Sequence, residues 1–389
     1  MVNTADEEQV SPPNAGERPP TSAELTNANQ VVAQAEDGTV FYLYKHQAGG
    51  HKPFLRSADG SVCKPAIALE LQFYQALDSQ YPQLKPFVPA FVGKVSVELN
   101  LSPTPCGSAA VAAAIAPVVL HRTQSKSPRI PHPSTTGKKR RLVRSASAAL
   151  SEQPRAGGAA GYSATLWRKE LSAANPTTTA TGPLQDYLVL GNLTRGFRRP
   201  CVLDIKMGTR QHGEDASPAK AMSHAAKCAA TTSLELGLRL CGMQIYDTDL
   251  DEYLLWDKHW GRQLTADDIV PALATYLSCG EELHWSTLER LLHKVVAMRA
   301  VIEQTHGLRF WGSSLLLIYE GDCRVSPSNE DVRLIDFAHC QMSAGLESPD
   351  EGLLLGLANI ARFLQELLAT RDDAKHFSAA DAHHIHDGQ

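Results

Sequence analysis

A short apolar segment interrupted by two charges, residues 200–208, constrains the fold more than any other part of the chain. Cys201, Val202 and Leu203 have the character of a buried strand, yet Asp204 and Lys206 follow at alternate positions. Side chains two residues apart on a strand share a face, so the carboxylate and the ammonium emerge together. Burying either charge is costly unless it is paired or meets a ligand. The segment therefore predicts either a structural ion pair or a binding site on a sheet.

The residues that follow this strand favour a binding site. Gly208 comes at once, Arg210 and His212 come next, and Ser217-Pro218 is a favourable helix start, with Ser as N-cap and Pro in the first turn. This arrangement suits a phosphorylated ligand.

Pro200, Asp204, Lys206 and Gly208 match the pattern P-x-x-x-D-x-K-x-G, which resembles the signature of the inositol polyphosphate kinase family. The longer string PCVLDIKMGTRQHG is most similar to the inositol hexakisphosphate kinase branch. The resemblance spans about residues 40–100 and 184–367. It implies a two-lobed, kinase-like α+β fold with ATP in the interlobe cleft. It also implies transfer of the γ-phosphoryl group to an inositol polyphosphate, with the hexakisphosphate favoured and a diphosphoinositol (inositol pyrophosphate) product.

The composition is that of an ordinary soluble protein. A chain of 389 residues with 43% hydrophobic residues can build one large or two modest domains. Its polar, acidic start lacks a secretory pattern, and its apolar runs are too short to cross a bilayer. Eight singly scattered cysteines indicate reduced thiols rather than a zinc site. We expect a cytoplasmic or nuclear monomer without a membrane span.

Changes in composition divide the chain into six expected segments. Residues 102–182 carry eleven Lys and Arg against two Glu, a local charge of +9 within an overall −5, which leaves −14 for the rest. This stretch is rich in Ala, Ser, Thr, Pro and Gly, so it predicts a long disordered insertion in the N-terminal lobe. The segments are a disordered tail (1–30), the first part of the N-terminal lobe (31–101), the basic insertion (102–182), the last strand of that lobe with the hinge (183–197), the catalytic lobe (198–370) and a flexible tail (371–389).

Local patterns predict the elements of each lobe. In the N-terminal lobe, β-favouring residues around Gly49-Gly50 and the turn signal Asp59-Gly60 predict a small antiparallel sheet, followed by a helix over 66–79. That helix should bury Leu69, Phe73, Ala76 and Leu77. In the other lobe, strands are expected at 240–246, 253–260, 310–321 and 332–340, and helices at 217–231, 284–305 and 353–368. A capping box, Ser286 with Glu289, should start the helix at 284–305, and Leu288, Leu292, Val295 and Met298 should form its apolar stripe.

Two glycines and a lysine are the first candidates for binding nucleotide phosphates. Gly49-Gly50 lies between expected strands, where the backbone could approach phosphates, although such a pair also makes an ordinary turn. Lys64, on the next strand, could reach the same phosphates as a point charge. The strings HQAGGH and VCKP resemble the hexakisphosphate kinase branch and imply the nucleotide-binding role.

The segment LGNLTRGF, residues 190–197, is expected to link the lobes. The resemblance implies that backbone groups near Gly191 and Leu193 hold adenine. Asp204, near this hinge, could hold the ribose hydroxyls or orient the acceptor hydroxyl, and both roles remain open. Lys206 is the candidate for contact with both the γ-phosphate and the acceptor, so Asp204 and Lys206 are the expected catalytic pair.

A set of cations is expected to bind the acceptor. Lys220, His224 and Lys227 would share one helix face, which by itself is more often a solvated surface. Six phosphate monoesters, however, bring on the order of −9 to −12 charges. Residues 195–227 contain seven Lys and Arg residues and only three acidic residues, so they can offset part of this negative charge. The expected substrate contacts are Lys206, Arg210, His212, Lys220 and Lys227, joined through the resemblance by Lys258, Arg262 and His339.

The strings SSLL (residues 313–316) and IDF (335–337) resemble two further motifs of the family. The resemblance implies that Asp336 binds magnesium, and we place the metal site at Asp336 and Ser314. At the end of a strand, a carboxylate can join water and phosphate oxygens around a hard cation. The expected cofactors are therefore ATP and Mg²⁺.

Weaker signals leave alternatives open. The run at residues 138–141, KKRR, could serve nuclear import, bind a polyanion or simply be solvated, and His383, His384 and His386 could bind a metal or belong to a frayed tail. Protein partners could bind through residues 102–182, whereas a nucleic-acid partner is not expected. Two other functions remain: a multikinase acting on less phosphorylated inositols, and a catalytically weak scaffold that binds polyanions or proteins through the insertion.

Overall fold

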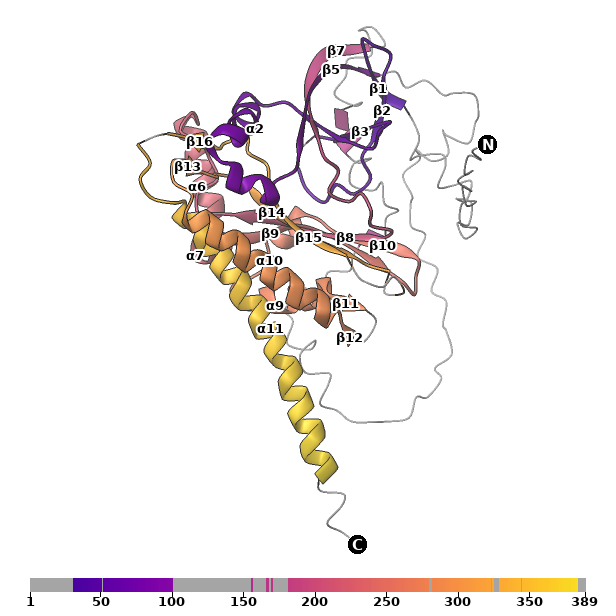
Figure 1. Cartoon of the computed structure of the whole chain (residues 1–389), viewed down its shortest axis with the longest axis vertical. Helices are drawn as coiled ribbons and strands as arrows, with labels where there is room; N and C mark the ends of the chain where they lie inside the picture. The colour runs from indigo at the N-terminus through magenta and orange to yellow at the C-terminus, as the bar shows by residue number, and fades with distance from the viewer. Residues whose placement is uncertain are drawn as a thin grey trace, which may run out of the picture.

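The computed structural model describes residues 31–50, 52–100, 155–156, 166–167, 169–170, 181–279, 282–322, 324, 329–343 and 345–383. These residues form two lobes, a small one built on a barrel and a larger one built on a sheet with helices on one side (Figure 1). The two-lobed α+β fold predicted from the sequence is confirmed.

The small lobe is a closed barrel of six antiparallel strands in the order β1-β2-β3-β4-β7-β5. Its core contains Val32, Phe41, Leu55 and Tyr187. The sequence predicted a small antiparallel sheet, whereas the structure is a closed barrel, because β1 also pairs with β5, which is distant in sequence. The strands are β1 (Val31–Ala35), β2 (Val40–Leu43), β3 (Leu55–Ser57), β4 (Val62–Pro65), β5 (Phe91–Asn100) and β7 (Thr181–Leu190).

Helix α2 (Ala68–Gln80) follows β4 and leads into the 3-10 helix η1 (Pro82–Phe87). Its buried face consists of Glu70, Phe73, Tyr74 and Leu77. Phe73 and Leu77 are buried as predicted, whereas Leu69 and Ala76 are only half-buried. The residue that the prediction missed at the start of this face is a carboxylate, Glu70. That carboxylate belongs to the site described below.

The large lobe is built on a six-stranded antiparallel sheet in the order β15-β14-β8-β9-β10-β6. The central strand β8 contains the charged motif, as its alternation of apolar and charged residues predicts. The strands are β6 (Arg155–Ala156), β8 (Pro200–Met207), β9 (Leu238–Asp247), β10 (Glu252–Trp256), β14 (Ser314–Glu320) and β15 (Glu330–Ile335).

Three helices cover one face of this sheet: α9 (Ile269–Tyr276), α10 (Trp285–Glu303) and α11 (Glu351–His383) (Figure 1). The stripe predicted for α10 is confirmed, since Leu288, Leu292, Val295 and Met298 are all buried. The capping box is wrong. The helix begins at Trp285 with His284 as N-cap and no side-chain cap, so Ser286 already lies within the first turn.

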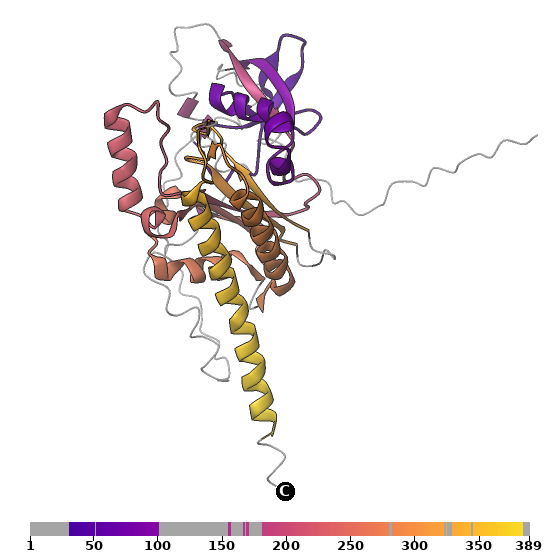
Figure 2. The ribbon, with the colours of Figure 1, turned by 60° about the vertical axis from the view of Figure 1, so that its left-hand side comes forward.

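The remaining elements are short. Helix α6 (Pro218–Ala229) stands at the side of the large lobe, next to α7 (Ser233–Leu236) (Figure 2). The predicted strand over residues 253–260 ends at Trp256, because Asp257 caps helix α8 (Lys258–Gly261) by accepting hydrogen bonds from His259 N and Trp260 N. The others are η3 (Ala266–Asp268), the pair β11 (Ser278–Cys279) and β12 (Glu282–Leu283), and the pair β13 (Leu308–Arg309) and β16 (Gln341–Met342).

Parts of the predicted insertion belong to the folded lobes. Strand β6 pairs with β10, and Trp167 is buried among the core residues of the barrel. Strand β7 begins at Thr181, before the predicted end of the insertion. The rest of the predicted insertion, including the run at residues 138–141, lies outside the described residues, as do the tail 1–30 and both His384 and His386.

The C-terminal helix is longer than predicted, since α11 continues to His383, beyond the expected lobe boundary at residue 370. Its segment Glu351–Arg371 is long and apolar enough to cross a membrane by length and composition. The apolar side chains Leu357, Ile360 and Leu364 are nevertheless buried in the core of the large lobe. The segment therefore packs as a core helix of the sheet.

Candidate active site

The register of β8 separates core residues from site residues. Leu203, Ile205 and Met207 belong to the core under the helices, so Asp204 and Lys206 point to the opposite face. On the neighbouring strand β14, Ser314 pairs with Lys206, and its hydroxyl lies 3.5 Å from the Lys206 ammonium. The strand alternation seen in the sequence thus places these polar groups on the side of the small lobe.

Three charges from distant parts of the chain meet at the end of β15. The Asp336 carboxylate lies 2.6 Å from Lys64 Nζ of the small lobe and 3.6 Å from Lys206 Nζ of the large lobe. Asp336 follows β15 directly and has a left-handed backbone, with φ of 67°, which directs the chain away from the sheet. The site therefore lies where the two lobes touch.

Helix α2 adds a second carboxylate. Glu70 is fully buried and accepts hydrogen bonds from Lys64 Nζ at 2.7 Å and from Phe337 N at 3.1 Å. It therefore orients the lysine and links α2 to the residue that follows Asp336. A carboxylate on the buried face of an otherwise apolar helix, spaced three and four residues before Phe73 and Tyr74, is the signal that could have revealed Glu70 in the sequence.

Burial and pairing set the charge states of this cluster. Burial alone would raise the pKa of Asp336, but Lys64 and Lys206 hold it well below its usual range. Burial alone would lower the pKa of Lys64, yet Asp336 and Glu70 keep it above its usual value. Burial raises the pKa of Asp204 to about 6, against the opposing effect of Lys206. Asp336 is therefore firmly ionised at neutral pH, whereas Asp204 titrates close to neutral pH.

One cavity between the lobes is lined by all seven residues predicted to bind the nucleotide: Gly49, Gly50, Lys64, Gly191, Leu193, Asp204 and Asp336. Its walls also include the apolar side chains of Val62, Leu190 and Leu316. Pockets that combine apolar walls with a few convergent polar groups are typical ligand sites. Gly191 and Leu193 line it at the hinge, and Lys64 and Asp336 place opposite charges on its wall.

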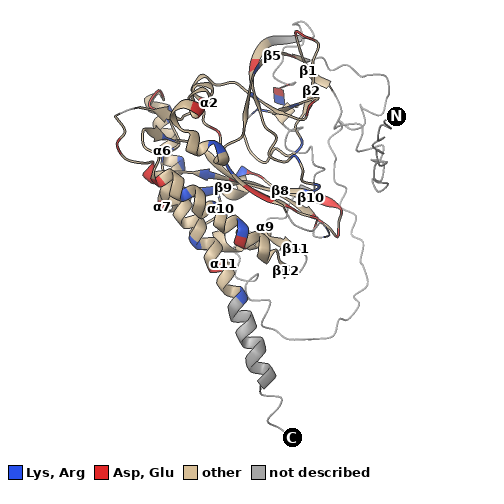
Figure 3. Cartoon of the chain, in the orientation of Figure 1, with Lys and Arg blue, Asp and Glu red and all other residues tan. Residues whose placement is uncertain are grey.

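A group of cations from α6, β9 and α8 lies beside Lys206. Burial lowers the pKa of Lys227, and the nearby charges of Arg262, Arg239 and Lys258 lower it further. Figure 3 shows Lys and Arg residues on α6 and β9. Within the described residues, no ion pair neutralises these four cations. Such a concentration of positive charge suits a polyanion.

Arg239 was not found from the sequence. It is 5% exposed, it pairs with Lys206 across β8 and β9, and it donates a hydrogen bond from NH1 to Ser233 Oγ at 3.0 Å. Burial lowers its pKa. The sequence signal for it is an arginine inside an apolar strand. The strand predicted at 240–246 began two residues after the actual start at Leu238, and so left Arg239 out.

Three histidines gather near the N-terminus of α6. The rings of His212 and His224 lie 6.4 Å apart, and His224 Nδ1 lies 3.0 Å from the carbonyl oxygen of Gln211. His339 is half-buried, and its Nδ1 is buried without a hydrogen-bond partner among the described residues. Burial lowers the pKa of His339, with a further contribution from Lys220. These residues thus form a second polar group on the same side as Lys206.

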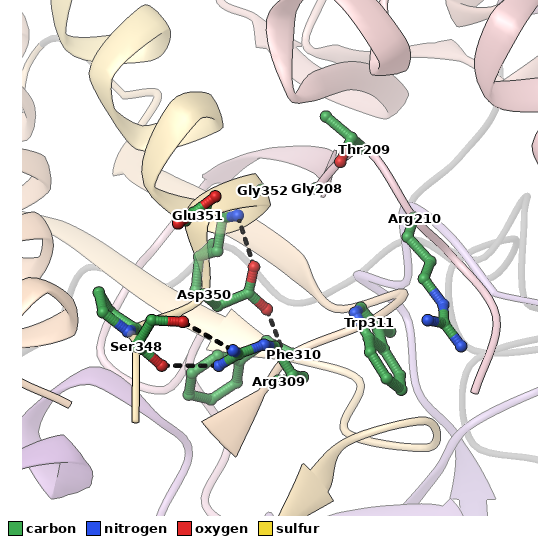
Figure 4. Close-up of a pocket in the computed structure, with 12 residues that line it drawn as sticks. Gly208, Thr209, Arg210, Arg309, Phe310, Trp311, Ser348, Asp350, Glu351 and Gly352 are labelled. Atoms are coloured by element: carbon green, nitrogen blue, oxygen red, sulfur yellow. Dashed lines mark hydrogen bonds between the residues drawn. The ribbon is translucent and has the colours of Figure 1, made fainter. Parts of the chain in front are cut away.

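Arg210 is directed elsewhere. Its guanidinium stacks over the Trp311 ring at 3.7 Å, and its Nε donates to the His212 carbonyl at 3.0 Å. Figure 4 shows Arg210 beside Trp311 in a separate pocket, whose floor is formed by Asp350 and the first turn of α11. Arg210 does not line the cavity between the lobes, and its predicted substrate contact remains a prediction.

Comparison with known proteins decides the family. Residues 187–365 match the family model described as inositol polyphosphate kinase. The chain is 31% identical over 380 residues to inositol hexakisphosphate kinase 3 of Mus musculus, an alignment that covers 83% of this chain and 94% of the relative. This chain belongs to the inositol polyphosphate kinase family.

Other relatives carry related names. Inositol hexakisphosphate kinase 1 of Rattus norvegicus is 31% identical over 413 residues, covering 85% of this chain and 94% of the relative. A crystal structure of the inositol phosphate multikinase of S. cerevisiae, in complex with ADP and Mn²⁺, aligns with a TM-score of 0.43 and 25% identity over 58% of this chain and 92% of that one. As a member of the inositol polyphosphate kinase family, the chain is an ATP-dependent phosphotransferase.

The kinase site is not a closed metal cage. No group of three or more His, Cys, Asp or Glu side chains able to hold a metal ion occurs among the described residues. Asp336 and Ser314 were predicted to share a cation, and both stand beside Lys206. An ionised carboxylate that is 24% exposed and lines the cavity between the lobes fits a hard cation that takes most of its ligands from water and nucleotide.

Proposed function

We propose that this kinase phosphorylates inositol hexakisphosphate to a diphosphoinositol pentakisphosphate, with ATP as donor and Mg²⁺ as the cation. The observation that carries the proposal is a cavity lined by Lys64, Asp204 and Asp336 beside a group of cations around Arg262 that form no ion pair among the described residues. A nucleotide fits the first region and a strongly anionic acceptor fits the second. The names of the relatives support the hexakisphosphate as acceptor.

In the proposed reaction, a phosphate oxygen of the acceptor attacks the γ-phosphorus of ATP. A new O–P bond forms, the bond from the γ-phosphorus to the bridging oxygen breaks, and ADP leaves with that oxygen. Because a phosphate oxygen is already anionic, no strong base is needed, and charge neutralisation is the main task of the protein. Lys206 lies between Asp336 of the nucleotide cavity and Arg239 of the cation group, so it would neutralise the transferred group, while Lys64 would hold the donor phosphates.

The cation would be held by Asp336, with Ser314 in reach, and when bound it would neutralise the charge of the donor phosphates. The pairing of Asp336 with two lysines keeps this carboxylate ionised and fixed in direction before any ligand arrives. Asp204 lines the nucleotide cavity beside Gly49, which supports a contact with the ribose.

A panel of acceptors tests the proposal. The protein is incubated with ATP, Mg²⁺ and inositol phosphates that carry three to six phosphates, and the products are separated by charge. We expect a product more anionic than the hexakisphosphate. Phosphorylation of only the less phosphorylated inositols would instead establish the multikinase alternative, and no turnover with any acceptor would favour the scaffold.

A further inference from the structure

The loop between β2 and β3 rests directly on the large lobe. A Cβ atom built on Gly242 of β9 would lie 1.9 Å from the carbonyl oxygen of Ala48, and a Cβ built on Gly49 would lie 2.0 Å from Asp204 Oδ2. Neither separation is compatible with a side chain. Two glycines, one from each lobe, therefore permit the loop backbone to touch both β8 and β9.

A hydrogen-bonded pair stands beside this contact. Gln244 of β9 is 1% exposed, and its Nε2 donates to the Pro200 carbonyl at 3.1 Å and lies 3.0 Å from His46 Nδ1 in the loop. Burial lowers the pKa of His46 to about 4, with smaller contributions from Lys45 and Arg199. The ring is therefore neutral at physiological pH and can accept this hydrogen bond.

The loop is also braced from within. Gln47 is 3% exposed, and its Nε2 donates to the carbonyl oxygens of Gly49 at 2.8 Å and Lys52 at 2.9 Å. Its Oε1 accepts from Phe54 N at 2.9 Å. These hydrogen bonds connect the two arms of the loop, so the loop should move as a unit. The position of the loop on β9 therefore determines the position of the Gly49 and Gly50 backbone.

We propose that Gly242 and Gln244 form a docking seat that positions the β2–β3 loop over the nucleotide. Neither residue of the seat lines the nucleotide cavity. Seven residues of the loop do, namely Tyr44, His46, Gln47, Ala48, Gly49, Gly50 and Phe54. Gly242 and Gln244 are thus positioning residues that act through the loop. The inference rests on the proposed function only in taking the ligand under the loop to be ATP.

The substitution Gly242→Ala tests the seat, since the added methyl group must push the Ala48 carbonyl away without removing a hydrogen bond. We expect the KM for ATP to rise on the order of tenfold, with the KM for the inositol phosphate changed less than about twofold. Faster hydrogen exchange is expected in residues 45–54. Equal changes in both KM values, or no change in either, would overturn the proposal.

A matched control separates positioning from general damage. Gly356 of α11 is packed as tightly, since a Cβ there would lie 2.3 Å from the Gly237 carbonyl oxygen, but it is not in contact with the loop. Gly356→Ala should lower the melting temperature without a selective change in the KM for ATP. If it reproduces the selective effect of Gly242→Ala, the seat does not exist.

Gln244→Leu provides a second test, because the two side chains are similar in size. The same change is made in a His46→Leu background, and affinity for a fluorescent ATP analogue is measured without acceptor. If Gln244 acts through His46, the loss of nucleotide affinity caused by Gln244→Leu should be at least several-fold smaller in the His46→Leu background than in the wild type. Strictly additive effects of the two substitutions contradict the seat. This binding assay keeps the inference testable even if the acceptor panel rejects the hexakisphosphate, because it needs the nucleotide alone.

Discussion

Single residues carry the chemistry of this site through charges that balance one another. Asp336 compensates Lys64 and Lys206, and Glu70 supplies the second negative charge that a lysine only 9% exposed requires. Asp204 lies two residues before Lys206 on β8, where the charge of Lys206 compensates its burial only in part. One of its carboxylate oxygens is buried without a hydrogen-bond partner among the described residues. The two aspartates therefore differ in what their replacement should do.

Lys206→Ala and Asp336→Asn should each lower kcat by about 100-fold or more, because each removes charge stabilisation at the transferred phosphate. Both variants should remain folded, but Asp336→Asn should also lower the melting temperature, because it removes one of the two carboxylates that compensate buried Lys64. Lys94→Ala is the control, since Lys94 forms an exposed ion pair with Asp186 on the barrel. A variant that melts normally and retains near-normal activity would contradict the assigned role.

Asp204→Asn should lower the activity but raise the stability of the protein at neutral pH. The pKa of Asp204 is raised to about 6 in the folded protein from 3.8, so its contribution to stability is fully present below pH 3.8 and is lost as the pH rises through 6. Ionised Asp204 thus costs roughly 2–3 kcal/mol at neutral pH. We expect the variant to melt higher than the wild type at pH 8 but not at pH 4. A pH-independent difference between the two proteins would reject this origin.

At the scale of elements, the alternation within β8 and the stripe of α10 show what local pattern can predict. Asp204 and Lys206 share a face because a strand repeats every two residues, and Leu288 and Met298 are buried because a helix repeats every 3.6 residues. Element ends are different, because they depend on which backbone groups find partners. Asp257 caps α8 within the predicted strand, and Ser286 does not cap α10.

Leu288→Ala and Ser286→Ala should separate these two effects in α10. Leu288 is fully buried, so its truncation should cost about 2–5 kcal/mol of unfolding free energy. Ser286 is exposed and makes no cap, so Ser286→Ala should change stability by less than about 0.5 kcal/mol. Chemical denaturation measures both. If Ser286→Ala lowered the free energy of unfolding by about 1 kcal/mol or more, Ser286 would have to be a helix cap after all.

For the whole molecule, the site exists only because two lobes meet. Lys64 comes from the barrel, Lys206 from the centre of the sheet and Asp336 from the end of β15. The part of the basic segment that the structure describes also joins this framework, through Trp167 in the barrel core and through β6 beside β10. The segment is thus partly integral to the fold.

Deletion of residues 103–150 should therefore leave kcat within about twofold of the wild-type value, because every residue of the site lies elsewhere. Deletion of 102–182 should instead lower the melting temperature, since it removes Trp167 and the start of β7. Thermal melting and a kinase assay on both deletions check this. Loss of catalysis in the shorter deletion would assign the segment a catalytic role.

The sequence by itself determined the chemistry: the strings around Asp204 and Lys206, around Gly49 and Gly50 and at residues 335–337 resemble motifs of the family and so indicate phosphoryl transfer, because a motif is a local property of the chain. Tertiary structure alone decided the closure of the barrel, the place of Glu70 and Arg239, the turn of Arg210 toward Trp311 and the docking of the loop on Gly242. Each of these depends on contacts between residues far apart in the chain, whose partners no local pattern specifies.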